Sequence, residues 1–269
     1  MSGKVVLQLS GLLGDMMLVG FGAATLLYAL WLLFKARGLV NLGRLSLVVA
    51  FGAAVITLAL GQGYVHGFSY PLFFLFLFLA LFLAMEFLFQ MSVLGLLVSA
   101  VGLILTSTRY WQLPPVPSPA ASNAAVAYWW VLRDLAFTTG AAVMALSLGA
   151  LVLLVITRNQ RPSDVVHPND LRDVSALLAR GTVPLFGFAA FAAGVALWRG
   201  QGLPPLEIWR FAWLGVLTLT SIGVLIAASQ RKPASVKTLA LATLSLVCLL
   251  AYTLGPLLLP LLTGTGMTP

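Results

Sequence analysis

The amino-acid sequence predicts an all-α, polytopic integral membrane protein: a bundle of about eight transmembrane helices forming one domain over residues 1–269. The chain has 269 residues, of which 61% are hydrophobic and only 8% are charged. Soluble domains carry about 25% charged residues, and a chain of this size cannot hide so much apolar surface from water. Apolar runs of about 20 residues, the length that crosses a bilayer, recur from end to end.

These runs give the expected spans in chain order: Met16–Phe34, Leu45–Tyr64, Tyr70–Phe89, Met91–Ser107, Leu135–Thr157, Thr182–Trp198, Phe211–Ser229 and Leu239–Leu262. The third and fourth spans almost touch. Glu86 and Gln90, four residues apart on one helical face, are expected to mark a tight turn at the membrane interface. The last span contains Pro256 and Pro260, and proline kinks or ends a helix, so its tail is expected to bend or to lie along the surface.

The basic residues are unevenly divided between the two sets of loops. Those after odd-numbered spans hold Lys35, Arg37, Arg44, Arg158, Arg161, Arg172, Arg180, Arg231, Lys232 and Lys237. The other side holds Lys4, Arg109 and Arg199, together with Arg133 and Arg210 if these contact water. The positive-inside rule then places both termini outside the cytoplasm, in a bacterial-type inner membrane. The net charge of +8 is attributed to this orientation, so the lipid bilayer rather than nucleic acid is the expected partner.

The loop from Arg158 to Gly181 contains the stretch HPNDLRDVSALLARG. Asn169 or Asp170 is a candidate helix cap with acid in the first turn. Apolar residues then recur at helical spacing, at Val174, Leu177 and Leu178. This pattern predicts a short amphipathic helix that lies on the inner leaflet.

The chain offers few groups that could bind a metal or a haem. Cys248 is the single cysteine and lies in an apolar run, so it is expected to be a small buried hydrophobe, with no disulfide within the chain and no zinc motif. His66, at the outer end of the second span, is either a solvated tip or the one outer-face nitrogen donor to a haem or metal. His167, followed by Pro168 in a polar loop, is expected to be structural.

The stretch AYWWVLRDLAF sets Arg133 and Asp134 directly after two tryptophans. Neighbouring residues point about 100° apart on a helix, so these two side chains are not expected to pair with each other. In one interpretation the tryptophans form an outer aromatic belt and Arg133 reaches up to the headgroups. In the other, the charges are buried and pair with Glu207 or Arg210.

Glu207 and Arg210 are three residues apart and can pair on one helical face. Two prolines precede them, as is favoured in a first helical turn. Trp209 and Trp213 are expected to anchor this helix start at the interface, which is the alternative to a buried site. Glu86 is read as a helix-end marker, with a proton relay as its alternative. No nucleophile with a matching base and no carboxylate pair is visible, so no catalytic residue is assigned.

Four stretches of the second half share their order and landmarks with one known family: SNAAVAYWWVLRDLAFTTGAAVMALSLGALVLLVI, LRDVSALLARGTVPLFGFAAFAAGVALW, LPPLEIWRFAW and KTLALATLSLVCLLAYTLGP. They resemble, in this order, the haem-handling membrane proteins of cytochrome c assembly, the CcsA-type proteins and their HemX-like relatives. The first resembles a long helix that usually carries a histidine. In the third, Pro205, Glu207 and Trp209 fall on the family's Pro, Glu and Trp after its Trp-rich signature.

The departures from this family concern the haem-binding residues. The family's Trp-Gly-x-x-Trp-x-Trp-Asp platform cradles haem, whereas the matching loop in this chain is the short RGQGL, with Pro204 in place of the Asp. The histidine of the long helix falls near Arg133 or Asp134, and the histidine after the signature falls in LTLTSIGVLIAAS, which has none. Haem iron needs axial ligands, so the resemblance implies a degenerate member that keeps the scaffold.

Three functions are therefore expected, in this order. The first is a non-catalytic CcsA-like membrane subunit or assembly factor of a respiratory, photosynthetic or cytochrome c maturation complex. Its candidate contacts with other membrane subunits are Arg133, Asp134, Glu207, Arg210 and Trp209. The second is a haem-binding or haem-delivering protein that uses His66. The third is a small-molecule transporter, although such proteins usually show internal repeats and broken helices near the midplane.

Overall fold

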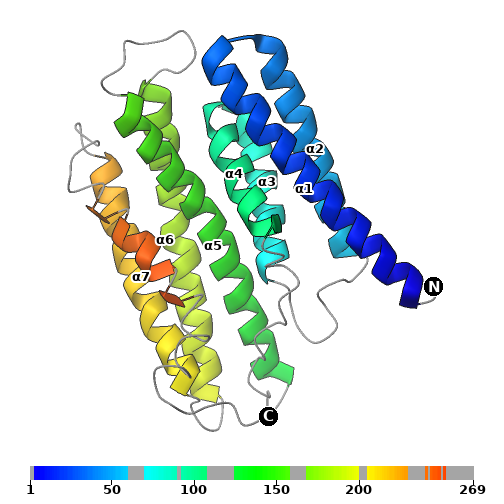
Figure 1. Ribbon diagram of the computed structural model, residues 1–269. Helices are drawn as coiled ribbons and strands as arrows, with labels where there is room; N and C mark the ends of the chain where they lie inside the picture. Colours follow the sequence, from blue (N-terminus) through cyan, green and yellow to red (C-terminus); the bar gives the residue numbers. More distant parts are fainter. Residues whose placement is uncertain are drawn as a thin grey trace, which may run out of the picture. The chain divides into compact units, whose positions relative to one another are not determined.

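The structure is a computed structural model that describes residues 3–59, 70–89, 92–107, 124–157, 168–199, 205–229, 240–241, 243–249 and 251–252. All of these residues are helical except Lys35, Ala36 and Ser92. The described helices are α1 (Gly3–Phe34), α2 (Arg37–Ala59), α3 (Tyr70–Phe89), α4 (Val93–Ser107), α5 (Ala124–Thr157), α6 (Pro168–Arg199) and α7 (Pro205–Ser229) (Figure 1). The described residues of 240–252 add a last helical stretch. The predicted all-α class is confirmed.

Among the described residues, five helices are long and apolar enough to cross a membrane: Gly11–Phe34, Arg37–Ala59, Val126–Leu154, Leu171–Arg199 and Glu207–Ile226. Two apolar helices are shorter, Leu72–Leu88 and Leu94–Ser107. Much of the predicted eighth span lies outside the described residues. The apolar helices support the predicted membrane protein.

Several helices begin earlier than the hydropathy of the chain predicts. α1 begins at Gly3 instead of Met16, and α5 begins at Ala124 instead of Leu135. α3, in contrast, matches its predicted range. Hydropathy locates the part of a helix that faces lipid, but the backbone hydrogen bonds of a helix continue through polar residues. The predicted spans are therefore cores of longer helices.

The connection between α1 and α2 is much shorter than the predicted loop, since only Lys35 and Ala36 separate the two helices. Lys35 has a φ of 55°, a left-handed backbone conformation that glycine usually adopts at the end of a helix. Its backbone N–H donates to the carbonyl of Trp31 at 2.7 Å, and its ammonium lies 5.7 Å from the centre of the Trp31 ring. These contacts fix a tight reversal, so α2 returns along α1.

The predicted surface helix of residues 169–180 is wrong. These residues are the first turns of α6, which continues through Pro184 to Arg199. Their buried face packs on α5, where the Ser147 hydroxyl donates to the carbonyl of Ser175 at 3.0 Å. Leu177, expected on the apolar stripe, is 54% exposed. Contact with α5, which a single helical pattern does not show, decides the orientation.

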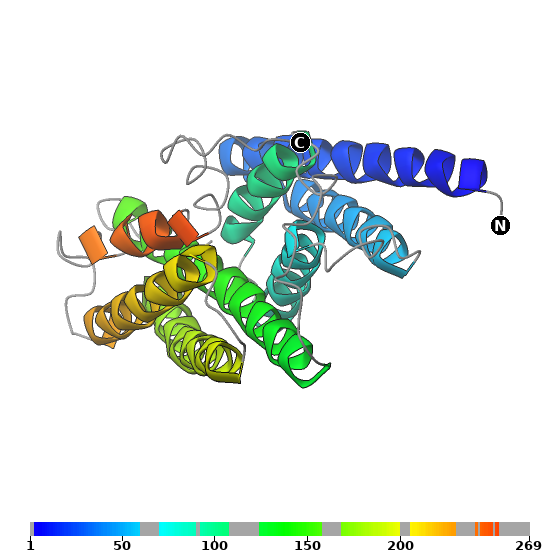
Figure 2. The same ribbon diagram turned by 90° about the horizontal axis from the view of Figure 1, so that it is seen from below.

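The helices form two compact units, the first with α1–α4 and the second with α5–α7 and the last helical stretch. Within the first unit, α1 packs on α2 and α4, and α3 packs on the same two helices (Figure 2). Phe21 and Tyr28 of α1 are fully buried against α4, where Gly102 and Gly95 leave space for their rings. These glycines permit close approach of two membrane helices.

Within the second unit, α6 packs against both α5 and α7. Small residues allow the α5–α6 contact: a Cβ at Gly140 would stand 3.0 Å from the ring of Phe186. Leu151, Ala179 and Val224 form a buried cluster that joins the three helices. Cys248 is a free, buried cysteine, as expected.

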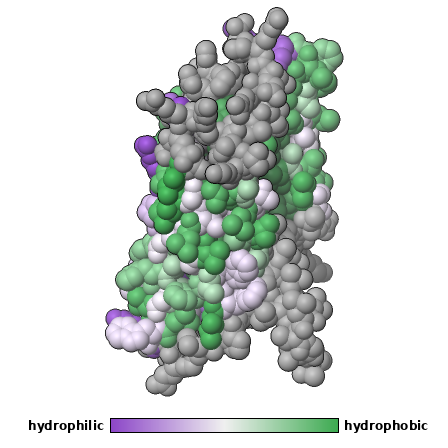
Figure 3. All heavy atoms as spheres, turned by 90° about the vertical axis from the view of Figure 1, so that its left-hand side faces the viewer, coloured by the Kyte–Doolittle hydropathy of each residue, from purple (hydrophilic) through white to green (hydrophobic). Residues whose placement is uncertain are grey.

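Much of the described surface is apolar. In the face shown in Figure 3, hydrophobic side chains cover most of the described area. Large apolar residues with more than half of their surface exposed include Leu26 and Leu33 of α1 and Leu219 and Ile226 of α7. Apolar faces of this kind suit contact with lipid or with other membrane helices.

Candidate functional site

Four charged side chains meet between α5 and α7. The Arg133 Nε–H donates to Asp134 Oδ1 at 2.6 Å, and the Nη1 of Arg133 donates to Glu207 Oε2. The other oxygen of Glu207 accepts from Arg210 Nη1 at 2.7 Å. One carboxylate of α7 thus bridges two guanidinium groups, and we refer to Arg133, Asp134, Glu207 and Arg210 as the charge cluster.

The charge cluster is buried. The exposed fractions are 2% for Arg133, 5% for Asp134, 2% for Glu207 and 8% for Arg210. Two guanidinium groups face two carboxylates, so the formal charges cancel. An isolated buried charge is very costly, and mutual pairing with hydrogen bonds is what makes such burial tolerable.

Local sequence features place these side chains. Pro205 is the first residue of α7 and Glu207 lies in its first turn, where the helix dipole stabilises a carboxylate. Arg210 follows three residues later and therefore lies on the same helical face. The separation between α5 and α7 is spanned by the long side chain of Arg133.

Aromatic rings surround the charge cluster. The guanidinium carbon of Arg133 lies 4.4 Å from the centre of the Trp130 ring, a cation–π distance. Tyr252, from the last helical stretch, is buried and its ring centre lies 3.9 Å from that of Phe137 on α5. Aromatic side chains therefore lie beside the buried charges, and in such an apolar environment each hydrogen bond is strengthened.

Among the described residues, two buried donors beside the charge cluster have no hydrogen-bond partner: the Nε of Arg210 and the Nε1 of Trp209. The Trp209 ring instead packs edge-on against Trp213, with ring centres 5.5 Å apart. The guanidinium of Arg210 is therefore less completely bonded than that of Arg133, whose Nε donates to Asp134. Each unpaired buried donor lowers the stability of the fold by about 1–3 kcal/mol.

Of the two sequence interpretations of Arg133 and Asp134, the structure agrees with the one in which both charges are buried. The expectation that they do not pair is wrong: their Cβ atoms diverge, but the flexible Arg133 side chain turns back to the neighbouring carboxylate. Trp130 is 5% exposed and covers Arg133, so it does not belong to an exposed aromatic belt. His66 and His167 lie outside the described residues.

A second polar cluster, not predicted from the sequence as a site, lies in the first unit. Arg44 of α2 donates through Nε to Glu86 Oε1 of α3 at 2.7 Å and through Nη2 to the Ser92 hydroxyl at 3.2 Å. Ser92 donates to the same Glu86 oxygen at 2.7 Å. Within the described part of the chain, the second Glu86 oxygen and the Tyr28 hydroxyl are buried with no hydrogen-bond partner. Glu86, a lone acid near a helix end, is the sequence signal for this cluster. Its partner Arg44 lies in a loop of the topology that the sequence predicts.

The residues of the charge cluster do not fit haem. Iron takes its axial ligand from groups such as imidazole, thiolate, thioether or phenolate, and a guanidinium cannot act as a ligand. At the positions where the resemblance expects a histidine stand Arg133 and Asp134, bonded to each other. The Tyr252 ring lies against Phe137 at 3.9 Å, so no porphyrin fits between these two rings.

In the part of the chain that the structure describes, no three His, Cys, Asp or Glu side chains converge in a way that could hold a metal ion. Comparison of the chain with family models, curated proteins and solved structures found no match. The site is therefore interpreted from its own geometry: a neutral, enclosed ion-pair network that connects α5 to α7.

Proposed function

We propose that this chain is a non-catalytic, CcsA-like integral membrane subunit or assembly factor of a redox complex, of the respiratory, photosynthetic or cytochrome c maturation kind. The observation that carries the proposal is the charge cluster. Two of its residues, Arg133 and Asp134, occupy the positions where the resemblance expects a haem-ligating histidine. Arg133 donates its hydrogen bonds to Asp134 and Glu207. A group that is bonded within the protein holds helices together instead of presenting a ligand to a substrate.

The surface supports the same proposal. Exposed large apolar side chains are spread over α1, α2, α6 and α7, which gives the chain broad faces for other membrane subunits. The proposed subunit acts by packing, and its polar interior keeps α5 and α7 in one arrangement.

The proposed topology has eight spans, with both termini on the non-cytoplasmic side of a bacterial-type inner membrane. The excess of Lys and Arg in alternate loops supports it. Reporter fusions at each terminus test it: an alkaline phosphatase fused to either end is expected to be active, and a fluorescent protein that matures in the cytoplasm is expected to stay dark. The opposite result at both termini would contradict the proposed orientation, and the opposite result at one terminus alone would contradict an even number of spans.

Purification of the full chain from its native membrane in a mild detergent tests the function. We expect stoichiometric recovery with other membrane subunits that carry redox cofactors, and an absorption spectrum that belongs to those subunits. Recovery of the chain alone as a stable monomer would contradict the proposal.

The same purified protein can be used to test the two alternative functions, haem binding and transport. A Soret band in the isolated chain that is lost in His66→Ala and kept in the matched control His167→Ala would establish haem binding through His66 instead. Substrate-dependent flux in proteoliposomes would establish a transporter. The proposal expects an isolated chain without a Soret band and without flux.

A further inference from the structure

An apolar groove of about 430 Å³ runs between α6 and α7. Its lining residues are Ala190, Phe191, Gly194, Val195, Trp198 and Phe211. Gly194 forms an open floor, because a Cβ added there would come no closer than 3.6 Å to the Phe211 ring. Phe191, Trp198 and Phe211 contribute aromatic rings to this shallow, open groove, and none of its lining residues is charged.

The groove has the length of one lipid leaflet. Ala190, Gly194 and Trp198 are four residues apart and form one row along α6. At 1.5 Å per residue this row is about 12 Å long, close to half of the roughly 30 Å hydrocarbon core of a bilayer. An acyl chain of one leaflet therefore matches the groove from end to end.

A positively charged residue follows the groove lining on α6. Phe191 and Val195 form a second row on α6, and Arg199 continues it after four more residues, in the last turn of the helix. Arg199 is exposed, and the neighbouring Trp198 is 83% exposed. Tryptophan and arginine together are typical of headgroup depth, and a guanidinium binds phosphate through two parallel hydrogen bonds.

We propose that the α6–α7 groove binds an anionic phospholipid, with one acyl chain over Gly194 and the phosphate at Arg199. The occupant follows from the chemistry of the two parts, an apolar channel of leaflet length and a cation at its interfacial end. This site does not depend on the proposed function of the chain.

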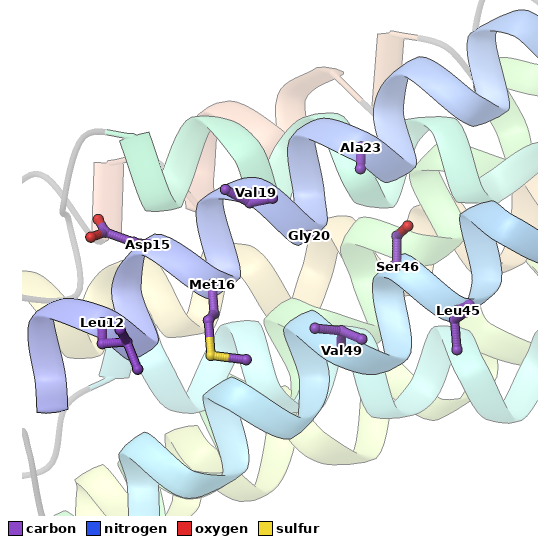
Figure 4. A pocket seen from close by; sticks show the side chains of 9 residues that line it. All are labelled: Leu12, Asp15, Met16, Val19, Gly20, Ala23, Leu45, Ser46 and Val49. Atoms are coloured by element: carbon purple, nitrogen blue, oxygen red, sulfur yellow. The ribbon is translucent and has the colours of Figure 1, made fainter.

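The first unit contains a comparable groove with the opposite charge. It lies between α1 and α2, has a volume of about 420 Å³ and is lined by Leu12, Asp15, Met16, Val19, Gly20, Ala23, Leu45, Ser46 and Val49 (Figure 4). The carboxylate of Asp15 repels a phosphate, so the same lipid is not expected there. This groove serves as an internal control.

The test uses the full chain in nanodiscs of mixed phosphatidylglycerol and phosphatidylcholine, followed by transfer to mild detergent and native mass spectrometry. We expect one retained phosphatidylglycerol per wild-type chain. Arg199→Gln is expected to lower this retention about tenfold, as for loss of a charge-assisted hydrogen bond. Gly194→Leu fills the groove and is expected to abolish retention.

Matched controls separate the groove from general effects of charge and size. Arg180→Gln removes an exposed arginine that lies 19 residues before Arg199 on α6, and Gly38→Leu adds bulk at a position of α2 with open space. Both, together with Asp15→Asn, are expected to retain the lipid as the wild type does. Thermal unfolding in detergent checks that each variant folds. Equal retention by Arg199→Gln and Arg180→Gln, or no preference for the anionic lipid in the wild type, would overturn the proposal.

Discussion

Replacement of Arg133 with methionine is expected to lower the free energy of unfolding by about 3–5 kcal/mol, the cost of removing one partner from a buried ion pair. Whole domains are stable by only about 5–15 kcal/mol, so this loss is a large part of the total stability. The reason is that Asp134 and one oxygen of Glu207 lose the guanidinium that bonds them. Unfolding by SDS in mixed micelles, followed by tryptophan fluorescence, measures the change.

Two further variants show whether the charge cluster acts as a closed, neutral unit. In Arg133→Met with Asp134→Asn, the remaining Glu207–Arg210 pair is neutral, with its 2.7 Å hydrogen bond intact. This double variant is expected to regain most of the lost stability, because removing a whole buried pair costs far less than removing half of it. The matched control Arg180→Met, at an exposed position, is expected to change stability by less than about 0.5 kcal/mol. A double variant as unstable as the single one would contradict a self-contained cluster.

The sequence predicts the class of the fold because lipid exposure leaves a strong hydropathy signal. It places α3 at its observed bounds and gives the last residue of α1, α4, α5 and α7 as the structure has it. The apolar spans begin later than α1, α2, α5, α6 and α7 do, because a polar extension such as Pro168 to Gly181 carries no hydropathy signal. Membership of that extension in α6 depends on its packing against α5, through contacts such as Ser147 with Ser175, and contacts of this kind cannot be read from one helix.

The charge cluster was only half predictable. The spacing of Glu207 and Arg210 specifies their pairing within α7, and the cost of burying charges singles out Arg133 and Asp134 as site candidates. The contact between these two pairs depends on how α5 and α7 pack in the folded protein. The sequence predicts this contact only as one of two alternatives. Helical geometry fixes the direction of Cβ and therefore predicts no pairing of Arg133 with Asp134, whereas the long arginine side chain bends back to its neighbour.

Alanine at both Gly95 and Gly102 is expected to separate α1 from α4. The two glycines are seven residues apart, and so are Tyr28 and Phe21, the rings that they face. The helices thus meet at two points two turns apart, and at each point an added Cβ would overlap a fully buried ring. Each alanine is expected to cost about 1–3 kcal/mol through overpacking, and the double variant more than either. Thermal unfolding in detergent gives the change in stability.

The control for this prediction is Gly52→Ala on α2, where a Cβ would meet nothing within 4 Å. At that position alanine is expected to stabilise the helix by up to about 1 kcal/mol, since glycine is the poorer helix former. The overlap itself is tested by making its partner smaller: Phe21→Leu in the Gly102→Ala background is expected to restore part of the lost stability. Because the propensity gain is the same at every helical glycine, a Gly102→Ala protein as stable as Gly52→Ala would mean that α1 and α4 do not approach closely at Phe21. In that case the contact of the two helices would have to rest on their larger side chains alone.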